Sequence, residues 1–373
     1  MGEAQEASLD VDGRPPGPEL IKRLARKIEP NLVGLPERLP QYVDFFRREV
    51  GNDSRLVAFE VTTAIAPDGQ VQLTGFVEFP ETLNALEKFL EALGFKVENH
   101  LETLPTVSLG ERTLGFLNTS HCLSYDRPRG RRGAVTDCLL AEPLYLLRED
   151  GDQMLVHSGE GYLGYLPTKD IHRVDEATFA NYLDGPCVRM IADHKPKEGQ
   201  MIPAGARFKW IRTDGESIIA ELPTGESLTV PAAKCEVHQP SLTQIDKVIQ
   251  NAEKLIGTKY VWGGRSSEGV DCSGLVQVSF ATAGWHLPRD ANQQFFLGRL
   301  TGTRTHRAAM RRGDTMYFIA ADGKIRHTAI YLGEDLYLNA EVPSVKIGSL
   351  NPAHKDYDPK RHSSFAFAKR LLD

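Results

Sequence analysis

A short run of residues, Asp-Cys-Ser-Gly at positions 271–274, constrains this chain more than any other feature. It follows a glycine-rich turn at positions 262–264 and opens an apolar stretch that predicts a helix. A cysteine in the first turn of a helix lies beside unpaired backbone N–H groups, at the positive end of the helix dipole. That field favours a thiolate over a thiol. The sequence therefore predicts that Cys272 is a nucleophile at the start of a helix.

The size and charge of the chain favour a multidomain globular protein. It has 373 residues, of which 41% are hydrophobic and 25% are charged, and this length exceeds that of a typical single domain. The net charge of -6 argues against nucleic-acid binding, and no stretch reaches the roughly 18 apolar residues of a membrane span. Residues 1–18 lack the apolar segment of a signal peptide. We therefore expect a cytoplasmic protein, or a cell-envelope protein if a leader precedes this sequence.

The five cysteines predict neither a disulfide framework nor a metal site. Their number is odd, and no two are spaced as Cys-x-x-Cys, which is the spacing typical of structural zinc. Apart from Cys272, they are expected to be structural thiols at Cys122, Cys138, Cys187 and Cys235. No metal and no organic cofactor is expected.

The first third of the chain predicts a disordered segment at residues 1–19 and a small α/β domain at 20–120. Its expected elements are a helical region at 20–50 interrupted by prolines, strands at 56–65 and 71–79, a helix at 81–93 and a strand at 95–101. Residues 71–77 and the helix after them are similar to the BON domain of some bacterial envelope proteins. A packing or spacer role is the alternative.

The middle of the chain predicts two small β-barrels, at residues 134–180 and 185–240. Short β-like runs alternate there with glycine-containing turn signals. Residues 161–166 resemble the closing motif of bacterial Src-homology-3 type barrels.

The last unit, residues 241–373, predicts helices followed by an antiparallel sheet. Apolar residues at helical spacing mark one helix that ends at Gly257 and another that runs from Cys272 to Gly284, and strands are expected at 315–319, 325–332 and 336–341. Helices followed by strands are an α+β layout. The whole chain is therefore expected to be a multidomain α+β protein.

His327 is the histidine best placed to serve the cysteine. It lies in an alternating strand, and a three-residue loop pairs Leu332 of that strand with Leu336 of the next. Asn339 then lies diagonal to His327, within side-chain reach, and Glu341 lies directly opposite. Asn339 is expected to orient the imidazole, with Glu341 as the rival, because a loop of another length changes the pairing.

These residues predict nucleophilic catalysis. Cys272 would attack, His327 would act as base and then as acid, and the backbone N–H of Cys272 would stabilise the oxyanion.

The last unit resembles the NlpC family of bacterial cell-wall cysteine peptidases over about residues 241–373. The motifs that carry the resemblance are Tyr260-Val261-Trp262-Gly263-Gly264, Asp271-Cys272-Ser273-Gly274, Leu287-Pro288-Arg289-Asp290, Arg312-Gly313-Asp314 and His327-Thr328-Ala329-Ile330-Tyr331-Leu332-Gly333. The resemblance implies a papain-like C-terminal domain. The third polar residue of that family is most often His, and Asn339 keeps an orienting hydrogen bond available.

With barrels upstream, the chain looks like the γ-D-glutamyl-L-diamino acid endopeptidases, which cut short murein peptides that have a free N-terminal L-alanine. The resemblance implies substrate contacts from Tyr260, Asp271, Ser273 and Asp290, and from Tyr162 and an acid, taken as Glu142, of the first barrel. Asp271 and Asp290 would pair with an α-ammonium group, but each also precedes an expected helix as an N-cap would. Tyr162 suits the core of a barrel equally well.

The expected function is hydrolysis of the γ-D-glutamyl–diamino acid bond of murein peptides during cell-wall recycling. The partner is then a murein peptide, with a further peptidoglycan contact expected through the barrels. Two alternatives stay open. One is a peptidoglycan-binding protein whose papain-like unit is inert, and the other is an amidase or acyltransferase that acts on a different substrate.

Overall fold

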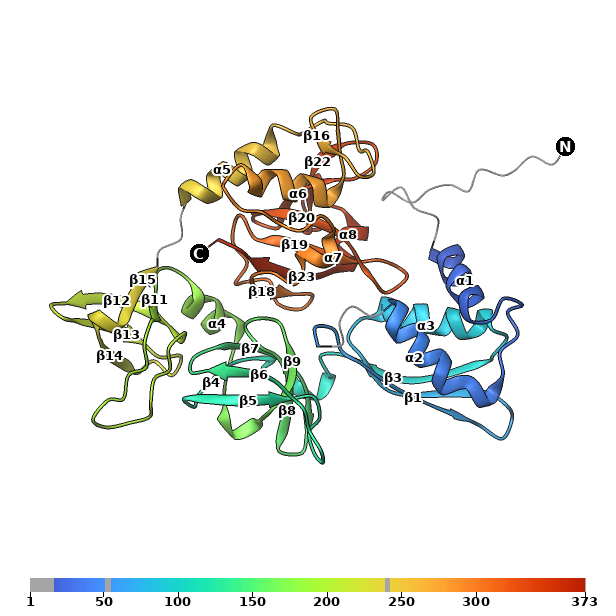
Figure 1. Ribbon diagram of the computed structural model, residues 1–373, viewed down its shortest axis with the longest axis horizontal. Coiled ribbons are helices and arrows are strands. Elements are labelled where there is room, and N and C mark those ends of the chain that lie inside the picture. Colours follow the sequence, from blue (N-terminus) through green and yellow to red (C-terminus); the bar gives the residue numbers. More distant parts are fainter. Residues whose placement is uncertain (1–16, 51–54, 239–241, 373) are drawn as a thin grey trace. The chain divides into compact units, whose positions relative to one another are not determined.

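The computed structural model describes residues 17–50, 55–238 and 242–372, and its helices and strands are labelled in Figure 1. The chain separates into two compact units. The first unit contains Met1–Leu104, Thr243–Leu297 and Arg311–Lys369, and the second contains Pro105–Leu242, Gly298–Met310 and Arg370–Asp373. Most of the segment predicted to be disordered lies outside the described residues. Its last three positions, 17–19, belong to a helix instead.

The N-terminal part of the first unit is a three-stranded sheet with three α-helices. Its elements are α1 Gly17–Ile28, the 3-10 helix η1 Pro36–Arg38, α2 Leu39–Val50, β1 Phe59–Ile65, β2 Val71–Val77, α3 Pro80–Ala92 and β3 Val97–Thr103. The central strand β2 pairs antiparallel with β1 and parallel with β3. The small α/β arrangement agrees with the sequence prediction, and the prolines divide the expected helical region into α1, η1 and α2.

The core of this part is formed by one face of the sheet and the helices above it. The rings of Phe46 in α2 and Phe89 in α3 are fully buried, with centroids 5.4 Å apart. Val71 and Leu73 of β2 belong to the same cluster. They are two residues apart because alternate side chains of a strand point to the same face.

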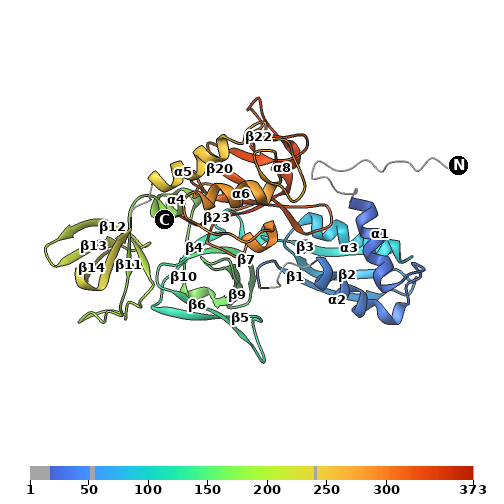
Figure 2. The ribbon, with the colours of Figure 1, turned by 45° about the horizontal axis from the view of Figure 1, so that its top comes forward.

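The C-terminal part of the first unit combines helices with an antiparallel sheet, as predicted. Its elements are α5 Leu242–Glu253, β16 Arg265–Ser266, β17 Gly269–Val270, α6 Cys272–Ala281, α7 Ala291–Gln294, β19 Thr315–Ile319, β20 Ile325–Gly333, β21 Leu336–Ala340, β22 Val345–Ser349, α8 Pro359–Ser364 and β23 Phe365–Arg370. The strands of this part follow the order β23-β19-β20-β21-β22. Helix α6 packs against β20, the central strand (Figures 1 and 2).

The hairpin between β20 and β21 has a shorter loop than the sequence predicts. Tyr331 pairs with Tyr337 as expected, but Leu336 pairs with Gly333 rather than with Leu332. The turn therefore has two residues, both with positive φ (53° and 61°), as a type I′ turn requires. Leu332 is the extra residue of a bulge, and the pairing beyond the bulge keeps the predicted register.

The second unit contains two antiparallel sheets. Its elements are the 3-10 helix η2 Val107–Leu109, β4 Leu114–Leu117, β5 His121–Tyr125, β6 Ala134–Leu139, β7 Pro143–Asp150, β8 Gln153–His157, β9 Leu163–Pro167, η3 Thr168–Asp170, β10 Ile171–Val174, α4 Glu176–Leu183, β11 Cys187–Met190, β12 Arg207–Asp214, β13 Ser217–Glu221, β14 Ser227–Pro231, η4 Ala232–Lys234, β15 Cys235–His238 and β18 Arg299–Thr303. The seven-stranded sheet has the order β10-β4-β7-β8-β9-β5-β6, and the five-stranded sheet has the order β14-β13-β12-β11-β15.

The strand pairing in the described part of the chain does not show the two closed barrels that the sequence predicts. Within the described residues, each sheet has an open order with two edge strands, β10 and β6 in the larger and β14 and β15 in the smaller. The larger sheet also includes β4 and β5, which lie before the predicted start at residue 134. These strands have only four and five residues, too short a pattern to distinguish from loop by alternation alone.

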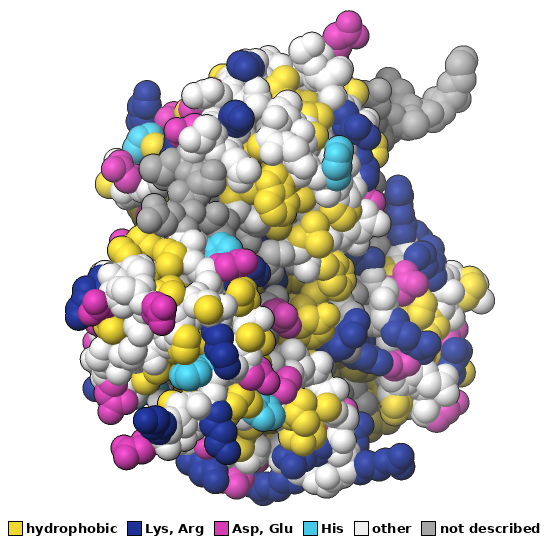
Figure 3. Space-filling view, turned by 60° about the vertical axis from the view of Figure 1, so that its left-hand side comes forward, with side chains coloured by type: hydrophobic (Ala, Val, Ile, Leu, Met, Phe, Trp, Pro, Cys, Tyr) yellow, Lys and Arg dark blue, Asp and Glu magenta, His cyan; other side chains and the backbone are white. Residues whose placement is uncertain are grey.

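The surface carries charges of both signs, and the described helices are not candidates for membrane spans. Lysine, arginine and acidic side chains all occur on the face seen in Figure 3. Across the described ranges, each helix is too short or too polar to span a bilayer.

Candidate active site

Cys272 is held at the start of α6 by the packing of the preceding turn. Asp271 caps the helix, because its Oδ1 accepts a hydrogen bond from the Gly274 N–H at 2.7 Å. A Cβ at Gly274 would lie 2.2 Å from the carbonyl oxygen of Gly264, so only glycine fits there. The glycines around the cysteine thus let the turn approach the helix closely.

The thiol of Cys272 lies beside the strand that carries His327. The Cys272 side chain is buried (6% exposed), and its Sγ is 4.0 Å from the carbonyl oxygen of Arg326. Arg326 directly precedes His327 in β20. The contact between α6 and β20 therefore brings the predicted nucleophile next to the backbone of the predicted base.

His327 is oriented by Asn339. The imidazole is 2% exposed, and its Nε2 lies 3.0 Å from Oδ1 of Asn339. The amide nitrogen of Asn339 points the other way and donates to the carbonyl oxygen of Lys346 at 3.4 Å. Because an amide oxygen only accepts hydrogen bonds, Nε2 carries a proton, and Nδ1 is the basic nitrogen of the neutral ring.

Glu341, the rival orienting residue, is engaged by two cations. Its Oε1 lies 2.8 Å from Nζ of Lys346, and its Oε2 lies 2.7 Å from a guanidinium nitrogen of Arg361. Burial favours a higher pKa, but Arg361, Lys346 and His327 outweigh it and lower the pKa of Glu341. The Glu341 carboxylate is therefore ionised, and Lys346 and Arg361 are its ion-pair partners.

The Asp271 carboxylate is hydrogen-bonded to groups of the protein itself and is not a free carboxylate in the pocket. It is 3% exposed, and its Oδ2 accepts hydrogen bonds from the Gly263 N–H at 2.8 Å and from Arg289 at 2.6 Å. Arg289 also donates to Ser273 Oγ at 2.8 Å. The hydrogen bond with Asp271 is the main reason that the pKa of Arg289 is raised. The N-cap interpretation of Asp271 is thus favoured over an ammonium-binding role.

Sequence reasoning assigned no role to Arg289, although it lies in the Leu-Pro-Arg-Asp motif. We expect Arg289→Ala to lower the free energy of unfolding by about 2 kcal/mol, because it leaves the buried charge of Asp271 without its cation. This figure is below the range for a fully buried pair, since the Arg289 side chain is 29% exposed. Urea denaturation measures the effect.

The matched control for this variant is Arg312→Ala. Arg312 pairs with Asp246 at the surface, and the two side chains are 45% and 48% exposed. Its loss should cost less than about 0.5 kcal/mol. Equal losses for the two variants would contradict a special role for Arg289.

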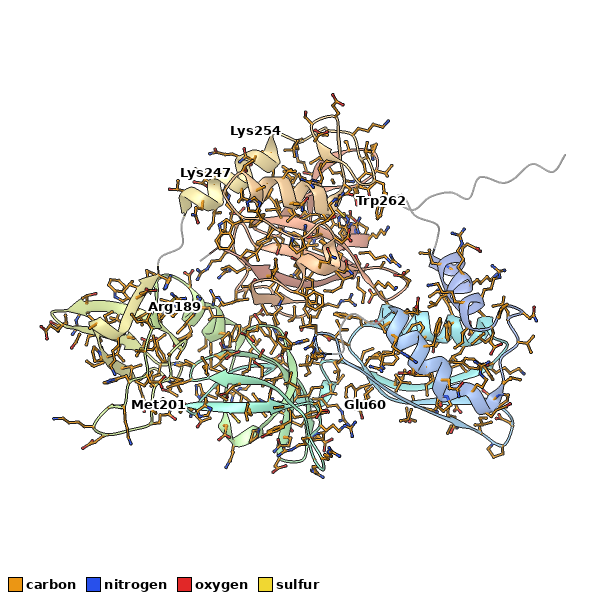
Figure 4. All side chains as sticks on the ribbon, viewed as in Figure 1. Glu60, Arg189, Met201, Lys247, Lys254 and Trp262 are labelled. Carbon is orange, nitrogen blue, oxygen red and sulfur yellow. The ribbon has the colours of Figure 1, made fainter. Side chains whose placement is uncertain are left out.

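A pocket of about 650 Å³ opens at Cys272. Ser273 and Asp290 line it, as do the aromatic side chains of Trp262 (Figure 4) and Phe296, which are 60% and 49% exposed. Asp290 is exposed and stands at the N-cap of α7. Asp271 also lines the pocket, so three of the predicted substrate-binding residues share it with the predicted nucleophile.

Tyr260 lies just before the glycine-rich turn. It is half-buried, forms a β-bridge with Val270, and donates its N–H to the carbonyl oxygen of Pro343 at 2.9 Å. These contacts are backbone contacts, and they help to fix the segment that leads into α6.

Glu142 and Tyr162 lie in the second unit, and each has a partner within it. The Glu142 carboxylate accepts hydrogen bonds from the N–H groups of Leu139 and Gly159, both at 2.9 Å. Tyr162 donates its N–H to Ser158 Oγ at 3.2 Å. Their predicted substrate roles stay predictions, and a role in holding turns of the larger sheet explains the contacts of Glu142.

Burial raises the pKa of Glu142 to about 7, against the lowering effect of its two backbone hydrogen bonds. The folded chain therefore holds this proton more tightly than the unfolded chain, whose carboxyl titrates near 4.5. The contribution of Glu142 to the free energy of unfolding should be largest below about pH 4.5. It should fall by at most about 3 kcal/mol as the pH rises through 7. Glu142→Gln should flatten that decline, as measured by urea denaturation at about pH 5 and pH 8. An unchanged slope would contradict this assignment.

Comparison with known proteins identifies the region that holds Cys272, His327 and Asn339. Residues 257–362 match the NlpC/P60 family. The gamma-D-glutamyl-L-lysine dipeptidyl-peptidase of Bacillus cereus is 25% identical over 264 residues, which are 64% of this chain and 75% of that protein. The gamma-DL-glutamyl hydrolase of Bacillus subtilis is 43% identical over 96 residues, which are 25% of this chain and 22% of that protein.

A solved structure of an NlpC/P60 family protein from Bacillus cereus covers 70% of this chain and 100% of its own, with 20% identity and a TM-score of 0.31. The chain thus spans 75% of the first relative named above but only 22% of the second. Residues 257–362 are an NlpC/P60 domain, a domain of the cysteine-peptidase kind found in peptidoglycan hydrolases.

Proposed function

We propose that this protein is a cysteine peptidase that hydrolyses the γ-D-glutamyl–diamino acid bond of short murein peptides. The observation that carries the proposal is the placement of the Cys272 thiol, at the start of α6 and beside β20, where Asn339 holds the ring of His327. This arrangement lies inside the NlpC/P60 domain. It supplies a nucleophile, a base and an orienting group for acyl transfer.

In the proposed mechanism, His327 Nδ1 takes the thiol proton and the Cys272 sulfur attacks the γ-carbonyl carbon of the D-glutamyl residue. The backbone N–H of Cys272, in the first turn of α6, stabilises the oxyanion. His327 then protonates the amine of the diamino acid, which leaves as the C–N bond breaks. Water, deprotonated by His327, hydrolyses the thioester and releases L-Ala-D-Glu and the thiol.

The substrate assignment is supported by the pocket and by the names of two relatives. Both names specify a γ-glutamyl substrate. The pocket volume of about 650 Å³ suits a short peptide. Asp290 is exposed at the pocket and would pair with the α-ammonium group of an N-terminal L-alanine.

The test of this proposal is product analysis with the tripeptide L-Ala-γ-D-Glu-diaminopimelate and its L-lysine counterpart. Mass spectrometry should detect L-Ala-D-Glu and the free diamino acid. N-acetylation of the alanine should slow cleavage, because it removes the charge that Asp290 would bind. Release of ammonia would instead indicate an amidase, and ligation of an added amine would indicate an acyltransferase. Absence of every product would favour an inert, peptidoglycan-binding domain.

We further propose that the enzyme acts on soluble fragments during cell-wall recycling in the cytoplasm. The free tripeptide should then be cleaved faster than cross-linked sacculi at equal bond concentration. Faster release from sacculi would favour action in the cell envelope, and cell fractionation would show the compartment.

A further inference from the structure

Two of the cations that line the pocket are already paired within the protein. Arg289 binds Asp271, as described above. The Nε atom of Arg326 donates to Asp322 Oδ2 at 2.7 Å. The charge of each guanidinium is therefore already balanced by a buried carboxylate.

A third cation, Lys324, lies at the same pocket in the turn before β20. The turn packs on the end of α2, because a Cβ at Gly323 would lie 2.8 Å from Cγ1 of Val50. Glu49 of α2 also lines the pocket, and it forms its ion pair with Lys27 of α1 at 2.7 Å. The N-terminal part of the first unit thus forms one side of the pocket and helps to place Lys324.

Lys324 and Asp290 differ from the other charged residues of the pocket. Among the residues that the structure describes, neither side chain forms an ion pair. Lys324 is half-buried, and burial followed by the charge of Arg326 lowers its pKa, while Asp322 and Glu49 oppose that change. An anion that binds such a half-buried ammonium group directly stabilises its charge through a charge-assisted hydrogen bond.

We propose that Lys324 binds a carboxylate of the substrate. This inference rests on the proposed function, since a murein tripeptide is a zwitterion with an α-ammonium group at one end and carboxylates on the D-glutamyl and diamino acid residues. Asp290 then supplies the negative charge for the α-ammonium group, and Lys324 supplies the positive charge for a carboxylate. The carboxylate bound by Lys324 is either that of the D-glutamyl residue or that of the diamino acid.

The test compares Lys324→Met with the wild type on three tripeptides. One has free carboxylates, one has the D-glutamyl α-carboxylate as an amide, and one has the diamino acid carboxylates as amides. Loss of a charge-assisted hydrogen bond should raise KM about 10- to 100-fold and leave kcat nearly unchanged. Lys324→Arg should restore part of the affinity. Lys355→Met, at an exposed position in the loop before α8, is the control and should leave KM unchanged.

The amides identify which carboxylate Lys324 binds. In Lys324→Met, amidation of that carboxylate should leave KM unchanged, because its partner is already absent. An unchanged KM on all three peptides would overturn the inference, and so would an equal loss on all three. Calorimetric binding to Cys272→Ala and to Cys272→Ala with Lys324→Met provides a readout without turnover. If the wild type cleaves no peptide but affinity depends on Lys324, only the proposed function fails. If no peptide binds to either variant, both fail.

Discussion

We expect Cys272→Ala to abolish hydrolysis of the γ-glutamyl tripeptide, with a loss of at least about 10⁴-fold in kcat, because no other group can form the thioester. The fold should survive. The cap of α6 depends on Asp271 and Gly274 rather than on the sulfur, and alanine is a good helix former. The rate of product release by mass spectrometry measures the effect, and circular dichroism verifies the fold.

The control for this variant is Cys235→Ala. Cys235 is a half-buried thiol of the second unit whose Sγ lies 3.2 Å from the carbonyl oxygen of Pro231. Its removal should leave turnover unchanged. Retained turnover in Cys272→Ala, or an equal loss in both variants, would contradict the mechanism.

The second large effect is expected at His327. His327→Ala should lower kcat by about 10³-fold or more, because the base and the acid of the reaction are lost together. Asn339→Ala should cost only about 10- to 100-fold, since one neutral hydrogen bond to the ring is removed and the imidazole itself remains. Steady-state kinetics on the same tripeptide gives the ranking.

Both side chains are buried, so the fold of each variant must be verified before the rates are compared. Glu341→Gln is a useful companion, because it removes the charge near His327 while keeping the size of the side chain. A loss at Asn339 that equals or exceeds the loss at His327 would contradict the assigned roles.

The sequence was sufficient to predict the elements around the site. The strand at 315–319 begins and ends where predicted, and Cys272 begins its helix. These elements are predictable because local signals agree: an Asp cap, a glycine that must approach a backbone, and an alternating strand that ends in a turn. The hydrogen bond between His327 and Asn339 also follows from counting along the hairpin.

The loop of that hairpin shows where local reasoning is less reliable. A two-residue turn with a bulge and a three-residue turn give the same pairing farther along the strands, so the side-chain pattern cannot distinguish them. The predicted proximity of Asn339 to His327 is therefore confirmed, whereas the predicted loop length is wrong. The catalytic role of Asn339 stays a prediction.

Long-range contacts could not be predicted in this way. Arg289 is 18 residues from Asp271 in the chain, and Glu49 and Val50 reach the pocket from a different part of the first unit. The short strands β4 and β5 belong to a sheet only because tertiary pairing supports them. These features depend on packing between distant segments, which periodicity does not report.

The most direct test of the central claim, that the Cys272 thiol is activated by His327, is labelling with iodoacetamide at about pH 6, followed by peptide mass spectrometry. The other thiols are internal controls, since burial raises the pKa of Cys122, Cys138 and Cys235. We predict that Cys272 reacts much faster than these three and that His327→Ala removes the difference. Labelling of Cys272 no faster than that of Cys122, or a rate independent of His327, would contradict the account.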